Sequence, residues 1–128
     1  MPSSLSPLRA GKRLYHIVDR RAWEAAQSTG EYRDLSLAKE GFIHCSTVSQ
    51  VIRVANQRFR GQAGLVLLAI VQSRLQARVQ YENLDGGAEL FPHIYGALNV
   101  DAVEALHAFD PGSDGTFVLP AAILPSDS

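Results

Sequence analysis

The sequence predicts a single α+β domain with a mixed, mostly antiparallel and split β-sheet flanked by three helices. Short strand-like runs alternate along the chain with segments whose apolar residues recur at the three- and four-residue spacing of amphipathic helices. The chain has 128 residues, of which 46% are hydrophobic, and this is enough apolar material for one core. The mixed order of these segments favours an α+β architecture over a parallel α/β one.

One domain is expected at residues 12–120, between two tails. Residues 1–11 and 121–128 are rich in serine and proline, and neither segment shows the period of a helix or a strand. No internal repeat or low-complexity block divides the sequence between them. We therefore expect a flexible tail at each end and no second domain.

The first strand is expected at residues 13–18, RLYHIV, and a helix follows it directly. Asp19 can cap this helix, because its side-chain oxygens can accept hydrogen bonds from the free N–H groups of the first turn. The helix then continues through Trp23 and Ala26, and Gly30 ends it.

After a loop, residues 41–46, GFIHCS, form the second predicted strand. Ser46 or Thr47 caps the helix that follows, and Gly61 supplies its stop. The apolar residues of this helix all fall on one face: Val48, Val51, Ile52, Ala55 and Phe59.

Three further strands are predicted between residues 65 and 96. Residues 65–71, LVLLAIV, are apolar throughout, as in a central strand that is buried on both faces. Residues 78–82, RVQYE, alternate in polarity and predict a neighbouring strand. Residues 91–96, FPHIYG, contain a proline that indicates a strand beginning or a sheet edge, because proline cannot donate to the ladder.

A third helix is predicted to open at Asn99 or Asp101, and residues 116–119 form a last strand. His107 lies near the end of this helix, where it caps carbonyl groups or meets solvent and the helix dipole favours its charge. The apolar residues on one side of the helix are Val100, Val103 and Leu106.

Composition and charge exclude several classes of protein. The formal net charge is −1 and no run of lysine or arginine occurs, which argues against bulk nucleic-acid binding. Cys45 is the only cysteine, so a disulfide framework is excluded and a reducing compartment is expected. The longest apolar run, residues 65–71, is too short to cross a bilayer. We expect a cytoplasmic protein with no membrane partner.

Three predicted strands each carry one imidazole, on His16, His44 and His93. Side chains alternate along a strand, so His44 and Cys45 point apart and form no nucleophilic pair, whereas His93 shares a face with Tyr95. A lone histidine on an apolar strand is most often a core residue bonded to a carbonyl. Three that converge instead indicate a ligand pocket, because each buried imidazole needs a partner.

Two other chemistries remain open at these strands. Glu82, at the end of its strand, is a candidate functional carboxylate, although a glutamate in that position is more often solvated. Three imidazoles can also ligate zinc and leave a fourth position for water. The histidines form no HxH or HxxxH pair, so the sequence does not favour a metal site.

Two strings, EGFIHCS at residues 40–46 and FPHIYG at residues 91–96, are specific enough to indicate a family. Shorter matching segments are Leu14-Tyr15-His16, Trp23, Tyr32, Ser36-Leu37, Gln50, residues 65–68 and Tyr81-Glu82. On these residues, which span roughly positions 12–106, the sequence resembles a small family of bacterial and plant proteins catalogued as domain of unknown function 952.

The layout also resembles the ADP-ribosyltransferase fold, including its tRNA 2′-phosphotransferase branch, in which a split sheet grips NAD. Tyr15 and His16 are similar to the aromatic-histidine pair on the first strand of that fold. His44 is similar to a histidine of the phosphotransferase branch. Glu82 and His93 are both candidates for the third landmark, which is a glutamate in many transferases.

The resemblance implies a site for NAD or an ADP-ribose-like nucleotide, a small-molecule ligand. The catalytic residues that it implies are His16, His44, His93 and Glu82, and the cofactor-binding residues are Tyr15, His16, His44, Ser46 and Tyr95. His16 then donates to ribose hydroxyls, a tyrosine stacks on a flat ring, and His44 holds a phosphate or the second ribose. Two functions follow, a transferase or hydrolase and a module that binds the nucleotide without turning it over.

Overall fold

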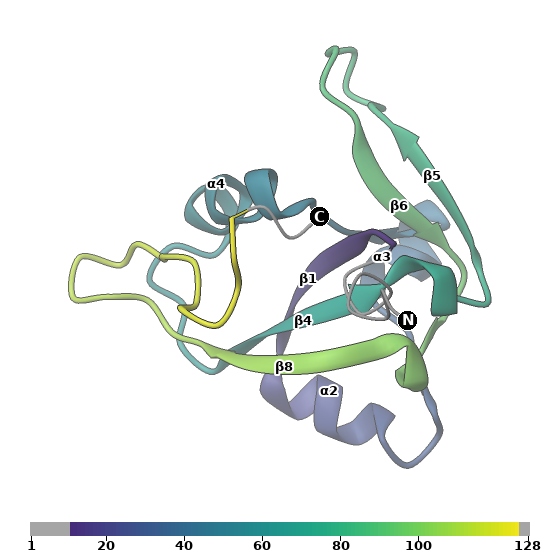
Figure 1. The fold of residues 1–128 in the computed structure, drawn as a ribbon, viewed down its shortest axis with the longest axis horizontal. Coiled ribbons are helices and arrows are strands. Elements are labelled where there is room, and N and C mark those ends of the chain that lie inside the picture. The colour runs from purple at the N-terminus through teal and green to yellow at the C-terminus, as the bar shows by residue number, and fades with distance from the viewer. Residues whose placement is uncertain (1–10, 126–128) are drawn as a thin grey trace, which may run out of the picture.

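The computed structural model of the protein describes residues 11–125 and shows an α+β fold (Figure 1). Its strands are β1 (Arg13–Asp19), β2 (Glu31–Tyr32), β3 (Ile43–His44), β4 (Leu65–Val71), β5 (Arg78–Glu82), β6 (Phe91–Tyr95), β7 (Leu98–Asn99) and β8 (Val103–Phe109). Its helices are α2 (Arg20–Ala26), α3 (Leu35–Glu40) and α4 (Val48–Arg58), with short 3₁₀ turns η2 (Gln72–Arg74) and η3 (Val100–Ala102). All strand pairs in this part of the chain are antiparallel, so the predicted α+β class with antiparallel sheets is confirmed.

The strands form three separate small sheets. Two of them are three-stranded, with the orders β1-β4-β8 and β3-β6-β5, and the third pairs β2 with β7. The two larger sheets meet at a bridge between Tyr15 and Ser46, whose backbones exchange hydrogen bonds of 2.8 and 2.9 Å. This bridge ties the middle of β1 to the chain just after β3.

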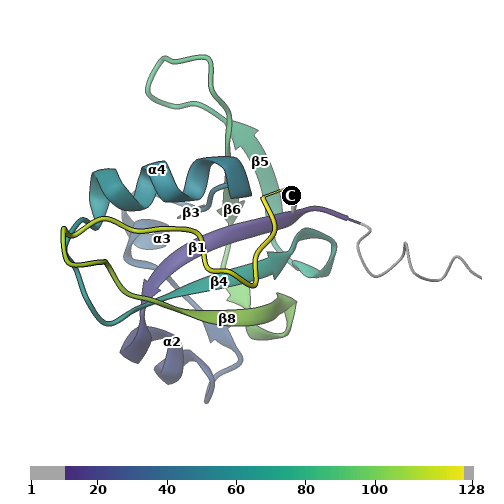
Figure 2. The same cartoon turned by 60° about the vertical axis from the view of Figure 1, so that its left-hand side comes forward.

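Apolar layers cover both faces of the β1-β4-β8 sheet. On one face Trp23 of α2 packs in a core cluster with Leu68 of β4, and on the other face Val51 of α4 packs with Leu67. Figures 1 and 2 show α2 and α4 on opposite sides of this sheet. All seven residues of β4 are buried, which confirms the prediction of a central strand that is covered on both faces.

The helix ends follow the local chemistry of the sequence. Asp19 caps α2 and accepts a hydrogen bond of 2.8 Å from the backbone N–H of Arg21. At the start of α4 the cap is Thr47, whose backbone N–H donates to the side chain of Gln50 at 3.0 Å. Gly61 adopts a φ of 77° just after α4, a conformation that favours glycine.

The predicted third helix is wrong, because its residues form η3 and the strand β8, which pairs with β4. Exposure alternates along β8, with Glu104 and Leu106 turned to solvent and their neighbours partly buried. Pairing with the buried central strand outweighs the helix propensity of the Glu, Ala and Leu residues here. His107 consequently lies opposite Leu67 in a sheet and not at a helix end.

Two expectations about strands also fail, and the alternative left open at Pro92 is resolved. β5 does not neighbour β4 but pairs with β6 in the second sheet. β6 is the central strand of that sheet, so Pro92 marks the beginning of a strand and not a sheet edge. Residues 116–119 form no strand, because the backbone N–H of Phe117 donates to the side chain of Asn56 at 2.7 Å and not to a neighbouring strand. Phe117 is nevertheless buried.

The helix α3 lies where the sequence predicted a loop. Asp34 caps it, and Gly41, with a φ of 90°, ends it. At the C-terminal end the apolar core reaches Ile123, beyond the predicted boundary at residue 120. Of the two predicted tails, residues 1–10 and 126–128 lie outside the described residues. Between residues 11 and 125, no helix has the length and apolar character that crossing a membrane requires.

Candidate functional site

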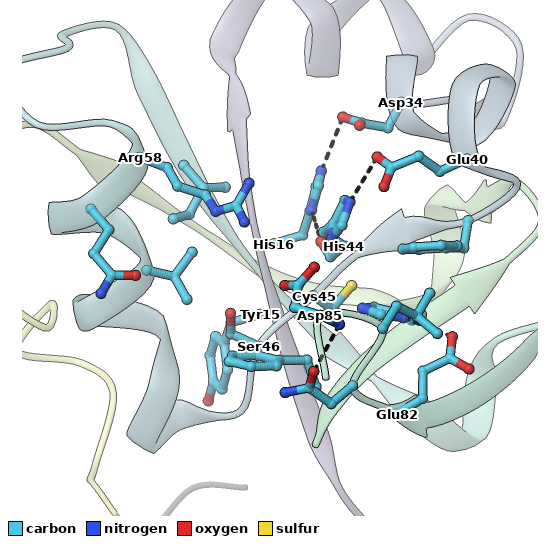
Figure 3. A pocket seen from close by; sticks show the side chains of 18 of the residues that line it. Tyr15, His16, Asp34, Glu40, His44, Cys45, Ser46, Arg58, Glu82 and Asp85 are labelled. Atoms are coloured by element: carbon cyan, nitrogen blue, oxygen red, sulfur yellow. Dashed lines mark hydrogen bonds and ion pairs between the residues drawn. The ribbon is translucent and has the colours of Figure 1, made fainter. Parts of the chain in front are cut away.

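A cavity of about 320 Å³ lies between α4, the middle of β1 and the hairpin of β5 and β6 (Figure 3). Its volume is at the lower end of the range of small-molecule sites. Six of the predicted site residues line it: Tyr15, His16, His44, Ser46, Glu82 and His93. Tyr95 does not line the cavity and reaches it only through a hydrogen bond to Glu82.

His16 enters the cavity from β1 and is only 6% exposed. Its Nδ1 lies 2.6 Å from the carbonyl oxygen of His44, and because a carbonyl can only accept, Nδ1 carries a proton and donates it. Its Nε2 is buried without a hydrogen bond from any residue in the described part of the chain, and Asp34 Oδ1 lies 3.5 Å away. One ring nitrogen of His16 is therefore left for Asp34 or for a ligand.

Asp34 is a site residue that the sequence analysis missed. Its carboxylate accepts hydrogen bonds of 2.5 Å from the hydroxyl of Tyr32 and 3.0 Å from the backbone N–H of Ser36. The pKa of Asp34 lies well below its ordinary value, because its contacts with His16, Tyr32 and Ser36 outweigh the effect of burial. The cap signal was present in the sequence, since an aspartate precedes a short segment that ends in Gly41.

His44 is half-exposed at the end of β3, and its Nε2 lies 3.0 Å from Glu40 Oε2. This contact lowers the pKa of the Glu40 carboxyl group. His44 also stands directly opposite His93 in the β3-β6 register, with 5.3 Å between the ring centroids. Cys45 points the other way into the apolar core, as strand alternation predicted, and burial raises the pKa of its thiol.

Glu82 and His93, the two candidates for the third landmark, bind each other. The Nδ1 of His93 lies 2.8 Å from Glu82 Oε2, and the hydroxyl of Tyr95 donates to the same oxygen. These hydrogen bonds, with that of Tyr95 contributing most, lower the pKa of Glu82. Phe42 stacks on the imidazole of His93 with 4.1 Å between the centroids and holds the ring in place.

Arg58 and Asp85 also line the cavity and were not predicted. Arg58 is the last residue of α4, and Asp85 belongs to the loop between β5 and β6. Arg58 is exposed and makes no ion pair with any of the described residues. No local pattern distinguishes it in the sequence from the other exposed arginines.

Three imidazole-carboxylate pairs thus surround one cavity: His16 with Asp34, His44 with Glu40 and His93 with Glu82. An imidazole that a carboxylate orients can act as a general acid or base near neutral pH, and both groups bind hydroxyls. Across residues 11–125, no group of three or more His, Cys, Asp and Glu side chains is placed to hold a metal ion. Each imidazole is turned toward its own carboxylate instead.

The comparison with protein families identifies the chain. A family profile described as "Protein of unknown function (DUF952)" matches residues 17–106, which is most of the fold. The chain belongs to this family. A search of curated proteins found no match.

The chain is also similar to solved structures of another protein. The chain is similar to the crystal structure of protein CC0527 from Caulobacter crescentus, with 37% identity and a TM-score of 0.76 over 84% of this chain and 95% of that one. The solution NMR structure of CC0527 gives 37% identity and a TM-score of 0.72 over 81% and 90% of the two chains. These names state no ligand or reaction, so the function has to be argued from the site.

Proposed function

We propose that the cavity binds NAD or an ADP-ribose-like nucleotide and that the protein is a transferase or hydrolase of the ADP-ribosyltransferase type. The observation that carries the proposal is the convergence of three imidazole-carboxylate pairs on one cavity. The meeting of two three-stranded sheets at Tyr15 and Ser46 resembles a split sheet and supports the fold resemblance.

The polar pairs have distinct roles in this proposal. His16 Nε2 and Asp34 Oδ1, 3.5 Å apart, bind the ribose hydroxyls. The Nδ1–H of His93 donates to Glu82, so the other ring nitrogen, Nε2, acts as the base that activates an acceptor hydroxyl or water. His44 is half-exposed and contacts the outer part of the nucleotide. Of the tyrosines expected to stack on a ring, Tyr15 lines the cavity.

Cleavage of a glycosidic bond requires the site to stabilise positive charge. This charge develops at the ribose carbon, and an ionised carboxylate beside it lowers the barrier. Asp34 and Glu82 are the candidates, because the pKa of each is lowered and both are ionised at neutral pH. Both carboxylates line the cavity.

A binding module without turnover is the second candidate function, and one observation favours it. Oε2 of Glu82 already accepts hydrogen bonds from both His93 and Tyr95. An oxygen that serves two protein donors has less charge to offer a developing cation. In this reading, the site holds the nucleotide and does not open its glycosidic bond.

The test is the release of nicotinamide from NAD by the wild type and by His16→Asn. The wild type is expected to release nicotinamide, and His16→Asn to lose at least tenfold in rate, on the order of one removed hydrogen-bonding group. His107→Asn is the matched control, because His107 lies on β8 and does not line the cavity. Circular dichroism and the melting midpoint check that the variants are folded.

The outcomes separate the two candidates. Nicotinamide release that depends on His16 and not on His107 supports the enzyme. Binding of NAD by the wild type with no release supports the binding module. If the wild type neither binds NAD or ADP-ribose nor releases nicotinamide, both candidates are rejected.

A further inference from the structure

Arg58 is the only lysine or arginine among the described residues that line the cavity. Figure 3 shows its side chain reaching from α4 into the cavity, toward His16 and His44. No carboxylate in residues 11–125 forms an ion pair with it, although Glu40 lines the same cavity. Arg58 still acts on Glu40 through its charge, because the pKa of Glu40 is lowered by His44 and, to a smaller extent, by Arg58.

His16 supplies a second and independent observation. This side chain is 6% exposed, and its Nε2 is a buried polar atom with no hydrogen bond from the described residues. Leaving a buried polar atom without a partner is destabilising, so such atoms in folded proteins usually have a partner such as water or a ligand. The nitrogen belongs to a residue that lines the same cavity as Arg58.

We infer that Arg58, beside the ribose that His16 holds, forms a subsite for a phosphate monoester, so that the ligand is a nucleotide of the proposed class that carries such a group. The inference rests on the proposed function, because it names the part of the nucleotide that this end of the cavity holds. The planar guanidinium of Arg58 presents parallel N–H groups that match two oxygens of a terminal phosphate. The Nε2 of His16, which lines the same cavity, binds a hydroxyl of the adjoining ribose.

The carboxylates nearby do not cancel the charge of this subsite. Asp34 lies 3.5 Å from His16, and Glu40 lies 3.0 Å from His44, so each acid has an imidazole beside it. Arg58 has no such partner in the described chain and is the cation that remains for a ligand. The subsite therefore favours a phosphate monoester over the bridging phosphates of a dinucleotide, because the monoester carries about twice the negative charge to pair with the guanidinium.

The test compares ligands with and without the phosphate. Nicotinamide mononucleotide and nicotinamide riboside are titrated by calorimetry into the wild type, Arg58→Gln and Arg21→Gln. Arg21 is the control, because it is an exposed arginine of α2 that does not line the cavity. Inorganic phosphate and acetate are titrated in parallel into ¹⁵N-labelled protein, with the amide signals of residues 57–59 and of His16 as the readout.

The wild type and Arg21→Gln are expected to bind the phosphorylated ligand roughly tenfold or more tightly than the riboside, and Arg58→Gln to lose this preference. Inorganic phosphate is expected to give saturable shifts that acetate does not give and that Arg58→Gln abolishes. Equal binding of both ligands by the wild type, an unchanged preference in Arg58→Gln, or phosphate shifts that do not saturate overturn the inference.

The same data keep the two proposals apart. If the riboside binds but the phosphate group adds nothing, the nucleotide site stands and the phosphate subsite is rejected. If inorganic phosphate binds through Arg58 but no nucleoside or nucleotide does, the subsite stands and the proposed function is rejected.

Discussion

The two three-stranded sheets of this protein use their faces differently. In β1-β4-β8 the central strand β4 is apolar and buried along its whole length, and helices α2 and α4 cover its two faces. In β3-β6-β5 one face places Ile43 and Ile94 in the core, whereas the other carries His44, His93 and Glu82. No residue of β5 is fully buried.

This difference separates the apolar core from the candidate site within one small fold. The first sheet gains its stability from apolar surface removed from water on both faces. One face of the second sheet buries less apolar surface, and on it ion pairs and ring contacts hold the side chains around a cavity. β1 joins the two regions, because Leu14 and Val18 pack in the core while His16 between them enters the cavity.

The largest expected effect comes from shortening a side chain on β4. Leu68 is 0% exposed, whereas Leu106, its partner in the β4-β8 register, is 47% exposed. Leu68→Ala is expected to lower the free energy of unfolding by about 2–5 kcal/mol through lost burial and a cavity. Leu106→Ala is expected to cost about 1 kcal/mol or less. Urea unfolding at pH 7 measures both, and equal losses would contradict the contrast between the buried central strand β4 and the edge strand β8.

A smaller effect is expected from removing one charge at the cavity. The pKa of Asp34 is lowered in the folded protein, so its ionised form stabilises the fold above the ordinary aspartate pKa of about 3.9. Asp34→Asn keeps an oxygen for the helix cap and removes the charge, with an expected loss on the order of 1–3 kcal/mol at pH 7.

The pH dependence of that loss is the sharper readout. Because the folded pKa is depressed, the stabilisation by Asp34 is lost as the pH falls below about 4 toward the folded pKa. The difference in unfolding free energy between the wild type and Asp34→Asn is therefore expected to shrink as urea unfolding is repeated from pH 7 down to pH 2. A difference that stays constant over this range would show that the charge of Asp34 does not stabilise the fold.

Sequence patterns predicted the parts of the fold that depend on local periodicity. The buried strand β4 and the amphipathic helix α4 were recognisable because their residues repeat one period over seven and eleven positions. β8 was mistaken for a helix, because Glu104, Ala105 and Leu106 favour a helix locally and only the pairing with β4 makes them a strand. The six-residue helix α3 was too short to show a period.

The candidate site was predictable on its strands and not on its helices and loops. Alternation placed His16, His44 and His93 correctly relative to their neighbours, and all three line one cavity. The partners of His16 and His44 are Asp34 and Glu40, at the two ends of α3, a helix that the sequence did not predict. Arg58 could not be singled out for a different reason, because no sequence pattern shows which arginine lines a cavity without an ion pair in the described chain.

The central claim is that the polar face of the second sheet binds a nucleotide. A thermal-shift series with NAD, ADP-ribose, nicotinamide mononucleotide and 2′-phosphorylated nucleotides tests it most directly, on the wild type, His44→Ala and His107→Asn. At least one ligand is expected to raise the melting midpoint of the wild type and of His107→Asn but not that of His44→Ala. At a hundredfold excess over its Kd, a bound ligand adds about 2.7 kcal/mol to the free energy of unfolding. No shift from any ligand, or an equal shift in His44→Ala, would contradict the claim.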